Sequence, residues 1–389
     1  MNSKAQKLLD LIEYFIYNRV IALVKPIDEK KILFASEAQS ELKGNLLAVY
    51  NEIKDNHPEY SCVVRVKGDR RDSLSITEKR ATWKDFSTAK YVFLDDFYGI
   101  TSAMKVRKGQ ELIQLWHACG AYKKFGFSRI NTGDHITTVN GGYRKYTKVS
   151  VTSDAIRSCY AEAFGLSEDK VEALGSPRTD IFFDECAKQL AKEHVMAKYP
   201  ELEDKKVILI APTYRGRKVQ DANYDFDKLK LDQMVTDLGK EYAIVVKWHP
   251  ALYNNIKKGI IEDYRLPKPI IDASDYSEFN ELMIAADILV TDYSSIIFEW
   301  ALMNKPIIYY TYDENEYEGS RGLYFDFDEY VYGPCVTDYE SLIEVIKNPE
   351  FVGESKNIKE KFIEKFMAAA DGNSTKRIVE RIIGKQERN

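Results

Sequence analysis

Short apolar runs alternate with segments of helical periodicity along this chain, and the alternation limits its fold more than any other feature. Segments that fit helices separate most of the apolar runs. Strands that alternate with helices are typical of parallel sheets covered by helices, so the sequence predicts an α/β fold. The runs that fit buried strands occupy residues 31–35, 62–66, 91–94, 112–115, 149–151, 171–174, 207–210, 243–246, 270–271, 288–290 and 307–310.

The pattern divides into two halves. Residues 184–206 form a charged stretch without a strand, and the alternation starts again after it. A length of 389 residues also exceeds that of one typical domain. We therefore predict two Rossmann-like domains, at residues 31–190 and 191–389, which face each other across a central cleft. A helical segment at residues 1–30 precedes them, and one large doubly wound sheet is the alternative architecture.

Composition excludes several classes of protein. A hydrophobic share of 44% is that of an ordinary globular chain, and a net charge of −5 argues against a dedicated nucleic-acid binder. The five cysteines are scattered without a CxxC pair, which fits free thiols in the cytoplasm. The sequence has no secretory signal and no apolar run near 18 residues. Walker A, GxGxxG and GxSxG motifs are also missing, which argues against ordinary kinases, dehydrogenases and hydrolases.

The N-terminal segment has an amphipathic pattern. Apolar side chains recur at helical spacing from Leu8 to Val24, with Lys4, Arg19 and Lys25 among the basic residues between them. A helix that lies on a membrane surface has this pattern. An ordinary helix that packs on the first domain has it too, and both interpretations stay open.

The turn from Thr291 to Ser295 is the clearest candidate ligand site. It follows the apolar run 288–290 and precedes an apolar helical segment. In α/β proteins a ligand usually binds where a strand's carboxyl end meets the next helix, because free backbone N–H groups point outward there. The hydroxyl groups of Ser294 and Ser295 add hydrogen-bond donors. The turn therefore predicts an anion site without a glycine-rich loop.

Two of the five histidines, His117 and His249, follow apolar strands, one in each half of the chain. Strand ends in both halves would face a common cleft. An imidazole there can act as a general base or contact a phosphate. A structural histidine that caps a strand or bonds to the backbone is the alternative for each of them.

Basic side chains in other loops supply candidate anion contacts. Lys123 and Lys124 follow His117 closely and can hold a diphosphate as point charges. Arg178, Arg215 and Arg321 lie in loops from which a guanidinium can clamp an anion. A solvated loop or a simple turn is the alternative at these positions.

Asp95 and Asp96 form a pair of carboxylates after the run 91–94. A metal site needs further ligands, and the sequence ties none to this pair. We therefore expect a structural or capping role for both residues. We expect no bound cofactor, and the divalent-metal dependence of any reaction stays open.

At these motifs the chain resembles the CDP-glycerol glycerophosphotransferase family, which comprises primases and polymerases of teichoic acids and related capsule polymers. Each matching segment is weak alone, but together they appear in the family's order between residues 30 and 384. The segments are Gln114-Leu-Trp-His117 with Lys123-Lys124-Phe-Gly126, Gly175-Ser-Pro-Arg-Thr-Asp180, Ala211-Pro-Thr-Tyr-Arg215, Lys247-Trp-His-Pro250, Val290-Thr-Asp-Tyr-Ser-Ser295, and Arg321-Gly322-Leu-Tyr with Gly333-Pro334.

The resemblance implies a GT-B fold, with an acceptor domain followed by a domain that binds the CDP-linked donor. It implies that a hydroxyl group of a membrane-linked teichoic acid or capsule precursor attacks the β-phosphate of CDP-glycerol or CDP-ribitol and releases CMP. Such an enzyme would work in the cytoplasm, peripherally on the inner face of the cell membrane. Whether the donor carries glycerol or ribitol, whether one unit or many are added, and the oligomeric state are left open.

The resemblance also implies roles by position. His117 corresponds to the base that activates the acceptor, and His249 to a partner that contacts phosphate or handles a proton. Ser294 and Ser295 correspond to ligands of the donor pyrophosphate. The supporting contacts are Thr291, Arg215 and Arg321 toward the donor, and Lys123, Lys124 and Arg178 toward the acceptor or a phosphate.

The chain departs from the family pattern at two places. Ala118 follows His117 where the family usually carries glycine, and Val331-Tyr-Gly-Pro334 lacks the first proline of the usual Pro-Gly-Pro. A glycine after the histidine permits unusual backbone dihedrals that alanine disfavours. The alternative functions are a GT-B glycosyltransferase that uses a nucleotide sugar and a non-catalytic scaffold with a decayed site.

Overall fold

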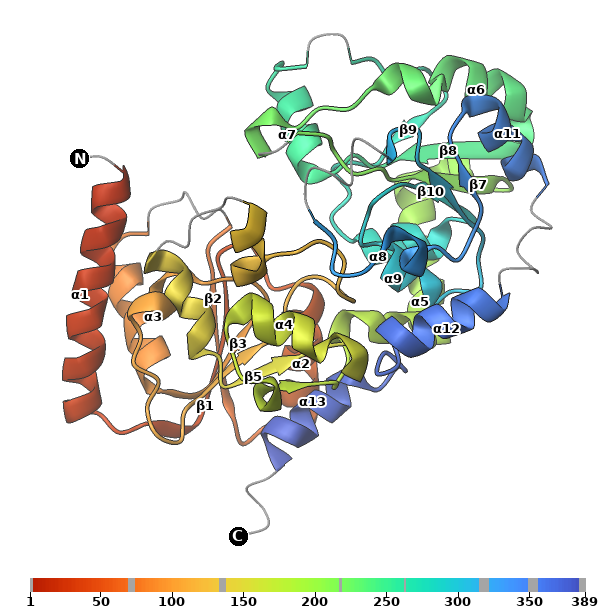
Figure 1. Ribbon diagram of the computed structural model, residues 1–389. Helices are drawn as coiled ribbons and strands as arrows, with labels where there is room; N and C mark the ends of the chain where they lie inside the picture. The colour runs from red at the N-terminus through yellow and green to blue at the C-terminus, as the bar shows by residue number, and fades with distance from the viewer. Residues whose placement is uncertain are drawn as a thin grey trace. The chain divides into compact units, whose positions relative to one another are not determined.

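The chain folds into two compact units, each built on its own parallel sheet (Figure 1). The first unit comprises Met1–Asp180 with Phe366–Asn389, and the second comprises Ile181–Lys365. The predicted α/β fold is therefore confirmed. The computed structural model describes residues 3–68, 74–132, 138–216, 219–261, 264–314, 322–348 and 356–384.

Among the described residues, the sheet of the first unit has six strands in the order β2-β1-β3-β4-β5-β6, and all neighbours are parallel. The chain runs from β1 to β2 at one edge, then crosses back to β3 on the other side of β1. This reversal places the topological switch point, where such sheets bind ligands, at the carboxyl ends of β1 and β3. The strands are β1 (Asp28–Ser36), β2 (Ser61–Val66), β3 (Ala89–Leu94), β4 (Glu111–Gln114), β5 (Lys148–Ser150) and β6 (Val171–Glu172).

The last helix that the structure describes, α13 (Ser374–Ile382), belongs to the first unit. In α13, Ile378 and Val379 are buried in the same core as Ile32 and Phe34 of β1. The carboxylate of Asp180 accepts hydrogen bonds from the first N–H groups of this helix. These contacts draw residues 366–389 away from the second half, with which the sequence pattern had grouped them. The described α-helices of the first unit are α1 (Ser3–Val24), α2 (Gly44–Asn56), α3 (Ile76–Thr88), α4 (Arg157–Phe164) and α13 (Ser374–Ile382).

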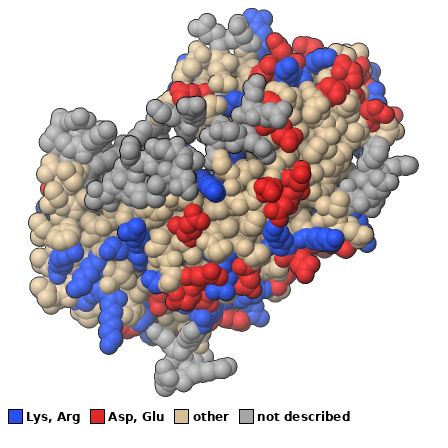
Figure 2. Space-filling model, in the orientation of Figure 1, with Lys and Arg blue, Asp and Glu red and all other residues tan. Residues whose placement is uncertain are grey.

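Helix α1 packs on α3 with one face and leaves another face exposed. Tyr14 is fully buried against the ring of Trp83, and Asn18 donates to the hydroxyl of Ser87 at 3.0 Å. Figure 2 shows lysine and arginine side chains gathered at the lower left, near the carboxyl end of this helix. None of the described helices is long and apolar enough to cross a membrane. The exposed apolar residues of α1 are Leu8, Leu9, Ile12, Phe15, Ile16, Val20, Leu23 and Val24.

The sheet of the second unit has the order β12-β11-β10-β7-β8-β9, again with parallel neighbours. Strands β8 and β9 lie on one side of β7, and β10, β11 and β12 lie on the other. The switch point therefore lies between β7 and β10, as in dinucleotide-binding sheets. The strands are β7 (Lys206–Ile210), β8 (Tyr242–Val246), β9 (Ile271–Asp272), β10 (Ile288–Thr291), β11 (Ile307–Tyr310) and β12 (Cys335–Val336).

The second unit corrects one prediction, because the sequence pattern indicates a single polar helix over about residues 226–242. The single helix expected over residues 226–242 is divided, because Lys230 adopts a positive φ of 42° that a helix cannot continue through. The core of this unit includes the fully buried Trp248 after β8. The α-helices described beyond Asp180 and before α13 are α5 (Glu185–Lys198), α6 (Leu231–Leu238), α7 (Pro250–Lys257), α8 (Phe279–Ala285), α9 (Ile297–Ala301), α11 (Tyr339–Lys347) and α12 (Lys356–Phe366).

Candidate functional site

His117 lies three residues beyond the end of β4, directly after a residue in an unusual backbone conformation. Trp116 has a φ of 56°, in the left-handed region, which costs a non-glycine residue about 1–3 kcal/mol. The N–H of Trp116 donates to the Gln114 side chain at 2.8 Å, and its carbonyl accepts from the Asn45 side chain at 2.6 Å. Because these buried partners hold the preceding residue, the imidazole of His117 has a defined place even though 54% of it is exposed.

Asn45 joins the turn of His117 to the loop of Arg178. Its side-chain oxygen accepts from the hydroxyl of Ser176 at 3.0 Å and from the backbone N–H of Arg178 at 2.8 Å. Its amide nitrogen is the donor to Trp116 described above. The structure thus brings the segments of His117 and Arg178 together at the carboxyl ends of the strands of the first sheet. Sequence reasoning missed Asn45, a buried polar residue in the first turn of α2.

Asp96 lies beside His117. It follows β3, the strand next to β4, and its Oδ1 is 3.8 Å from Nδ1 of His117. Only 13% of its side chain is exposed. The preceding residue, Asp95, is buried, and burial raises the pKa of its carboxyl group to about 6. These two carboxylates stand at the switch point of the first sheet, although the sequence predicted only a structural or capping role for them.

The loop after His117 tolerates Ala118. The backbone φ of Ala118 is not positive, so an alanine fits here without the strain of a left-handed conformation. The left-handed position of this loop is Gly120, with a φ of 62°. Lys123 and Lys124 follow on the same loop and are partly exposed.

The turn from Thr291 to Ser295 lies at the switch point of the second sheet. The hydroxyl of Thr291 is buried and donates to the carbonyl of Ala211 at 2.7 Å, so it links β10 to the end of β7. Ser294 and Ser295 are partly exposed, and their hydroxyl groups form no hydrogen bond to another described residue. The following helix, α9, has only five residues. The hydroxyl groups and turn amides are therefore better placed than a helix dipole to hold an anion.

Arg215 is enclosed by acidic side chains. Its guanidinium forms two hydrogen bonds to Asp313, at 2.5 and 2.8 Å, and one to Asp292 at 2.8 Å. Burial lowers the pKa of the guanidinium, but the carboxylates outweigh this effect and raise the pKa above its ordinary value. Three tyrosine rings lie within 5.5 Å of the guanidinium carbon: Tyr224, Tyr293 and Tyr312.

The ion pairs of Arg215 act on the serine turn. Asp292, which Arg215 contacts, also accepts from the N–H of Thr213 at 2.7 Å and is 1% exposed. The loops after β7 and β10 are thereby joined. This arrangement favours a positioning role for Arg215 over the phosphate contact that the sequence predicted. Arg321, the other arginine predicted for the donor site, lies outside the described residues.

His249 caps helix α7. Its Nδ1 accepts a hydrogen bond from the N–H of Ala251 at 3.1 Å, and its ring lies 4.8 Å from that of Tyr214. An Nδ1 that accepts must be unprotonated, so the neutral ring carries its hydrogen on Nε2. The exposed imidazole can therefore donate a hydrogen bond to an anion. Capping and ligand binding, which were alternatives in the sequence, are compatible because they use different nitrogens.

Lys247 directly follows β8, at the same carboxyl end of the second sheet as His249. Its ammonium group donates to the carbonyls of Ala273, Ser274 and Tyr276 at 2.8–3.2 Å. Burial lowers the pKa of Lys247 to about 8. The lysine therefore holds the turn after β9 and is not predicted to contact a ligand.

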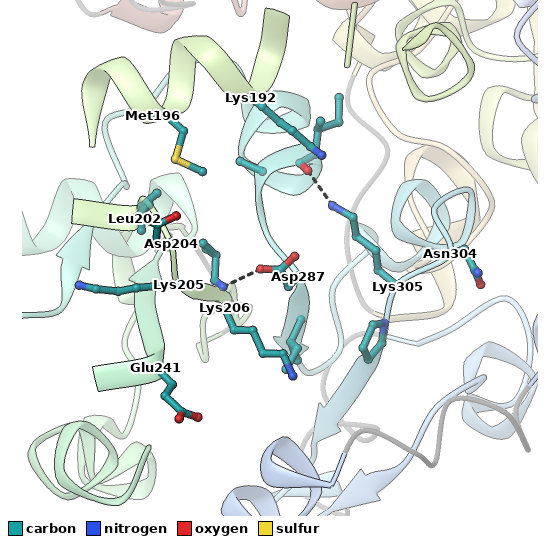
Figure 3. A pocket seen from close by; sticks show the side chains of 15 residues that line it. Lys192, Met196, Leu202, Asp204, Lys205, Lys206, Glu241, Asp287, Asn304 and Lys305 are labelled. Carbon is teal, nitrogen blue, oxygen red and sulfur yellow. Dashed lines mark hydrogen bonds between the residues drawn. The ribbon is translucent and has the colours of Figure 1, made fainter. Parts of the chain in front are cut away.

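A cavity of about 850 Å³ lies at the amino-terminal ends of strands in the second sheet (Figure 3). Lys206 and Asp287 line it, as does Lys305, which donates to the carbonyls of Ile284 and Ala286 at the end of α8. This cavity is remote from the carboxyl ends where the predicted residues gather, so we do not assign the reaction to it. The described residues contain no cluster of three or more side chains suited to a metal ion.

Comparison with known proteins decides the family. Residues 17–384 match the model of the CDP-Glycerol:Poly(glycerophosphate) glycerophosphotransferase family. The chain belongs to this family. The resemblance predicted from the motifs is thus confirmed, over almost the whole length of the chain.

Similar proteins act on teichoic acids, according to their names. The chain is 38% identical to the teichoic acid poly(ribitol-phosphate) polymerase of Bacillus spizizenii and 34% identical to the ribitol-phosphate polymerase TarL of Staphylococcus aureus. The matches cover 99% and 95% of this chain but only 61% and 66% of those relatives. A solved structure of the wall teichoic acid polymerase TagF covers 100% of this chain and 99% of its own, with a TM-score of 0.78 and 20% identity. That likeness supports the fold.

Proposed function

We propose that this protein transfers an alditol phosphate from a CDP-alditol to a hydroxyl group of a lipid-linked teichoic acid or capsule precursor. The observation that carries the proposal is the family match over residues 17–384. The position of Ser294 and Ser295 at the switch point of the second sheet supports it, because a donor pyrophosphate needs such a cluster of donors.

In the proposed reaction the acceptor oxygen forms a bond to the β-phosphorus of the donor. The pyrophosphate P–O bond breaks, and CMP leaves with the bonding electron pair. Phosphoryl transfer of this kind depends mainly on positioning and on neutralisation of charge. Residues that hold the pyrophosphate and a base that removes the acceptor proton are therefore the main contributions the protein makes.

We assign removal of the acceptor proton to His117 and binding of the donor phosphates to residues of the second unit. His117 takes the proton of the acceptor hydroxyl as the new bond forms. Ser294 and Ser295 hold the pyrophosphate, and His249 donates to it through Nε2. Lys123, Lys124 and Arg178 are proposed contacts of the acceptor or of a phosphate. Arg215 and Thr291 shape the turn without contacting the donor.

We propose CDP-ribitol as the preferred donor. Relatives that match at least 94% of this chain at 33–38% identity are named as ribitol-phosphate polymerases. Those named as poly(glycerol phosphate) polymerases are 26% identical. A direct test offers CDP-ribitol, CDP-glycerol and UDP- and GDP-sugars in parallel with a lipid-linked acceptor. CMP released fastest from CDP-ribitol supports the proposal, whereas UDP or GDP release would favour a glycosyltransferase.

We also propose that the exposed apolar face of α1 binds an anionic membrane surface. A lipid-linked acceptor places the reaction at a membrane, and exposed apolar side chains beside basic ones are suited to the lipid interface. Replacement of Ile12, Ile16 and Leu23 by glutamate should abolish co-sedimentation with vesicles that contain anionic lipid. The control is Ile260→Glu, which places one glutamate at an exposed isoleucine elsewhere. Equal sedimentation of the triple variant and the wild type would exclude this role.

A further inference from the structure

We infer that Asp96 positions His117, so that the two residues act as a histidine–aspartate pair in the proposed transfer. The inference rests on the proposed function, which makes His117 the base. Its first observation is the distance of 3.8 Å between Oδ1 of Asp96 and Nδ1 of His117. The carboxylate comes from the end of β3 and the imidazole from the end of the adjacent strand β4. The sheet therefore fixes both ends of the pair.

A second observation is that one buried side chain holds both members. Gln114 is fully buried, and its amide nitrogen donates to the carbonyl of Asp96 at 3.1 Å. Its side-chain oxygen accepts from the N–H of Trp116, the residue before His117. The N–H of Phe97 also donates to the Asp96 carboxylate at 2.6 Å, which limits its rotation. A carboxylate that lay near an exposed histidine only by chance would not need these hydrogen bonds to hold it.

The geometry assigns a distinct task to each imidazole nitrogen. With Nδ1 turned toward the carboxylate, its hydrogen points to Asp96 and leaves Nε2 as the proton acceptor. The acceptor hydroxyl loses its proton to Nε2, and the carboxylate stabilises the imidazolium that results while it stays ionised. A separation of 3.8 Å is longer than a hydrogen bond. Such contacts are often long without substrate and shorten in the reacting complex.

Other charged groups near the pair bear on its titration. Asp95 lies beside Asp96, is 2% exposed, and its raised pKa of about 6 places it in the range where an imidazole titrates. Lys123 and Lys124 follow His117 on the same loop. A pH profile of the reaction rate would combine the titrations of all these groups, so the test must observe the ring of His117 itself.

The test replaces Asp96 by asparagine in the full chain and follows the imidazole of His117 by NMR titration, along with CMP release from CDP-ribitol. Removal of the nearby negative charge disfavours the imidazolium, so the midpoint of His117 should fall by about 0.5–1 pH unit. The turnover number should fall about tenfold to a hundredfold, with the KM for the donor unchanged. Asp96→Glu should recover part of the turnover.

The chain contains a matched control. Glu59 lies 3.6 Å from Nδ1 of His57 in the same unit, so Glu59→Gln removes a carboxylate from an imidazole that has no proposed role. It should leave the turnover number and the titration of His117 unchanged.

If the titration midpoint of His117 is unchanged in Asp96→Asn, the pairing is overturned. A shifted midpoint with an unchanged turnover number would also overturn it, because the pair would then have no part in the reaction. The titration needs no substrate. If the wild type releases no CMP, the proposed function fails while the contact between Asp96 and His117 is still tested.

Discussion

Replacement of Arg215 by alanine separates two explanations of this arginine. In the structure its guanidinium neutralises Asp292, which is 1% exposed, and Asp313, whose side chain is 12% exposed. Alanine leaves both carboxylates without their cation. Removal of one partner from a buried ion pair typically costs about 3–5 kcal/mol. We therefore expect Arg215→Ala to lower the free energy of unfolding of the second unit by about that amount.

The assay is hydrogen exchange, measured by mass spectrometry on peptides that cover β7 and β10. A loss of about 3 kcal/mol increases exchange through unfolding by about a hundredfold. Arg265 is exposed, so Arg265→Ala provides the control for simple loss of a positive charge and should change the free energy of unfolding by less than about 0.5 kcal/mol.

A compensated variant tests the reasoning further. Arg215→Met combined with Asp292→Asn and Asp313→Asn removes the cation and both charges that it neutralises. If Arg215 acts only on the turn, this variant should recover stability and most of the donor affinity. Wild-type stability of Arg215→Ala, with donor binding lost in both variants, would instead identify Arg215 as a phosphate ligand and refute our assignment.

Two further predictions concern the second unit. Ser294→Ala should weaken binding of CDP-ribitol about tenfold in calorimetric titration, because one hydrogen bond to a charged group is lost; Ser277→Ala is the control, and equal affinities for Ser294→Ala and the wild type would exclude the phosphate contact. Burial lowers the pKa of Lys247 to about 8 from 10.5, so the unfolded chain binds more protons between these values and stability should rise as the pH increases from 8 to 10. Lys247→Met should show a smaller rise in urea unfolding than the wild type, whereas Lys258→Met should match the wild type. Identical slopes for all three proteins would contradict the assigned cause.

The strands of both sheets were predictable because they are apolar runs between polar turns. Ile307–Tyr310 is an example, with the same bounds in the sequence pattern and in the structure. The edge strand β12 has two residues and was missed, because so short a run shows no periodicity. Helix α3 was also missed, although Ser75 and Glu78 form a capping box that marks its start.

The contacts within the site were less accessible to sequence reasoning. The order of strands places Asp96 beside His117, and periodicity does not reveal that order. Arg215 was recognisable as a candidate anion clamp, but its acidic partners lie 77 and 98 residues away in the chain. A pattern that identifies a cation cannot tell whether the anion that it binds is a ligand or part of the protein.

The most direct test of the central claim is mass spectrometry of a lipid-linked acceptor after incubation with CDP-ribitol. The wild type should add one or more ribitol phosphates and release one CMP for each unit added. His117→Ala should fold normally and lose transfer by about a hundredfold or more. Transfer at the wild-type rate by His117→Ala, or an acceptor that gains no ribitol phosphate with either protein, would contradict the account.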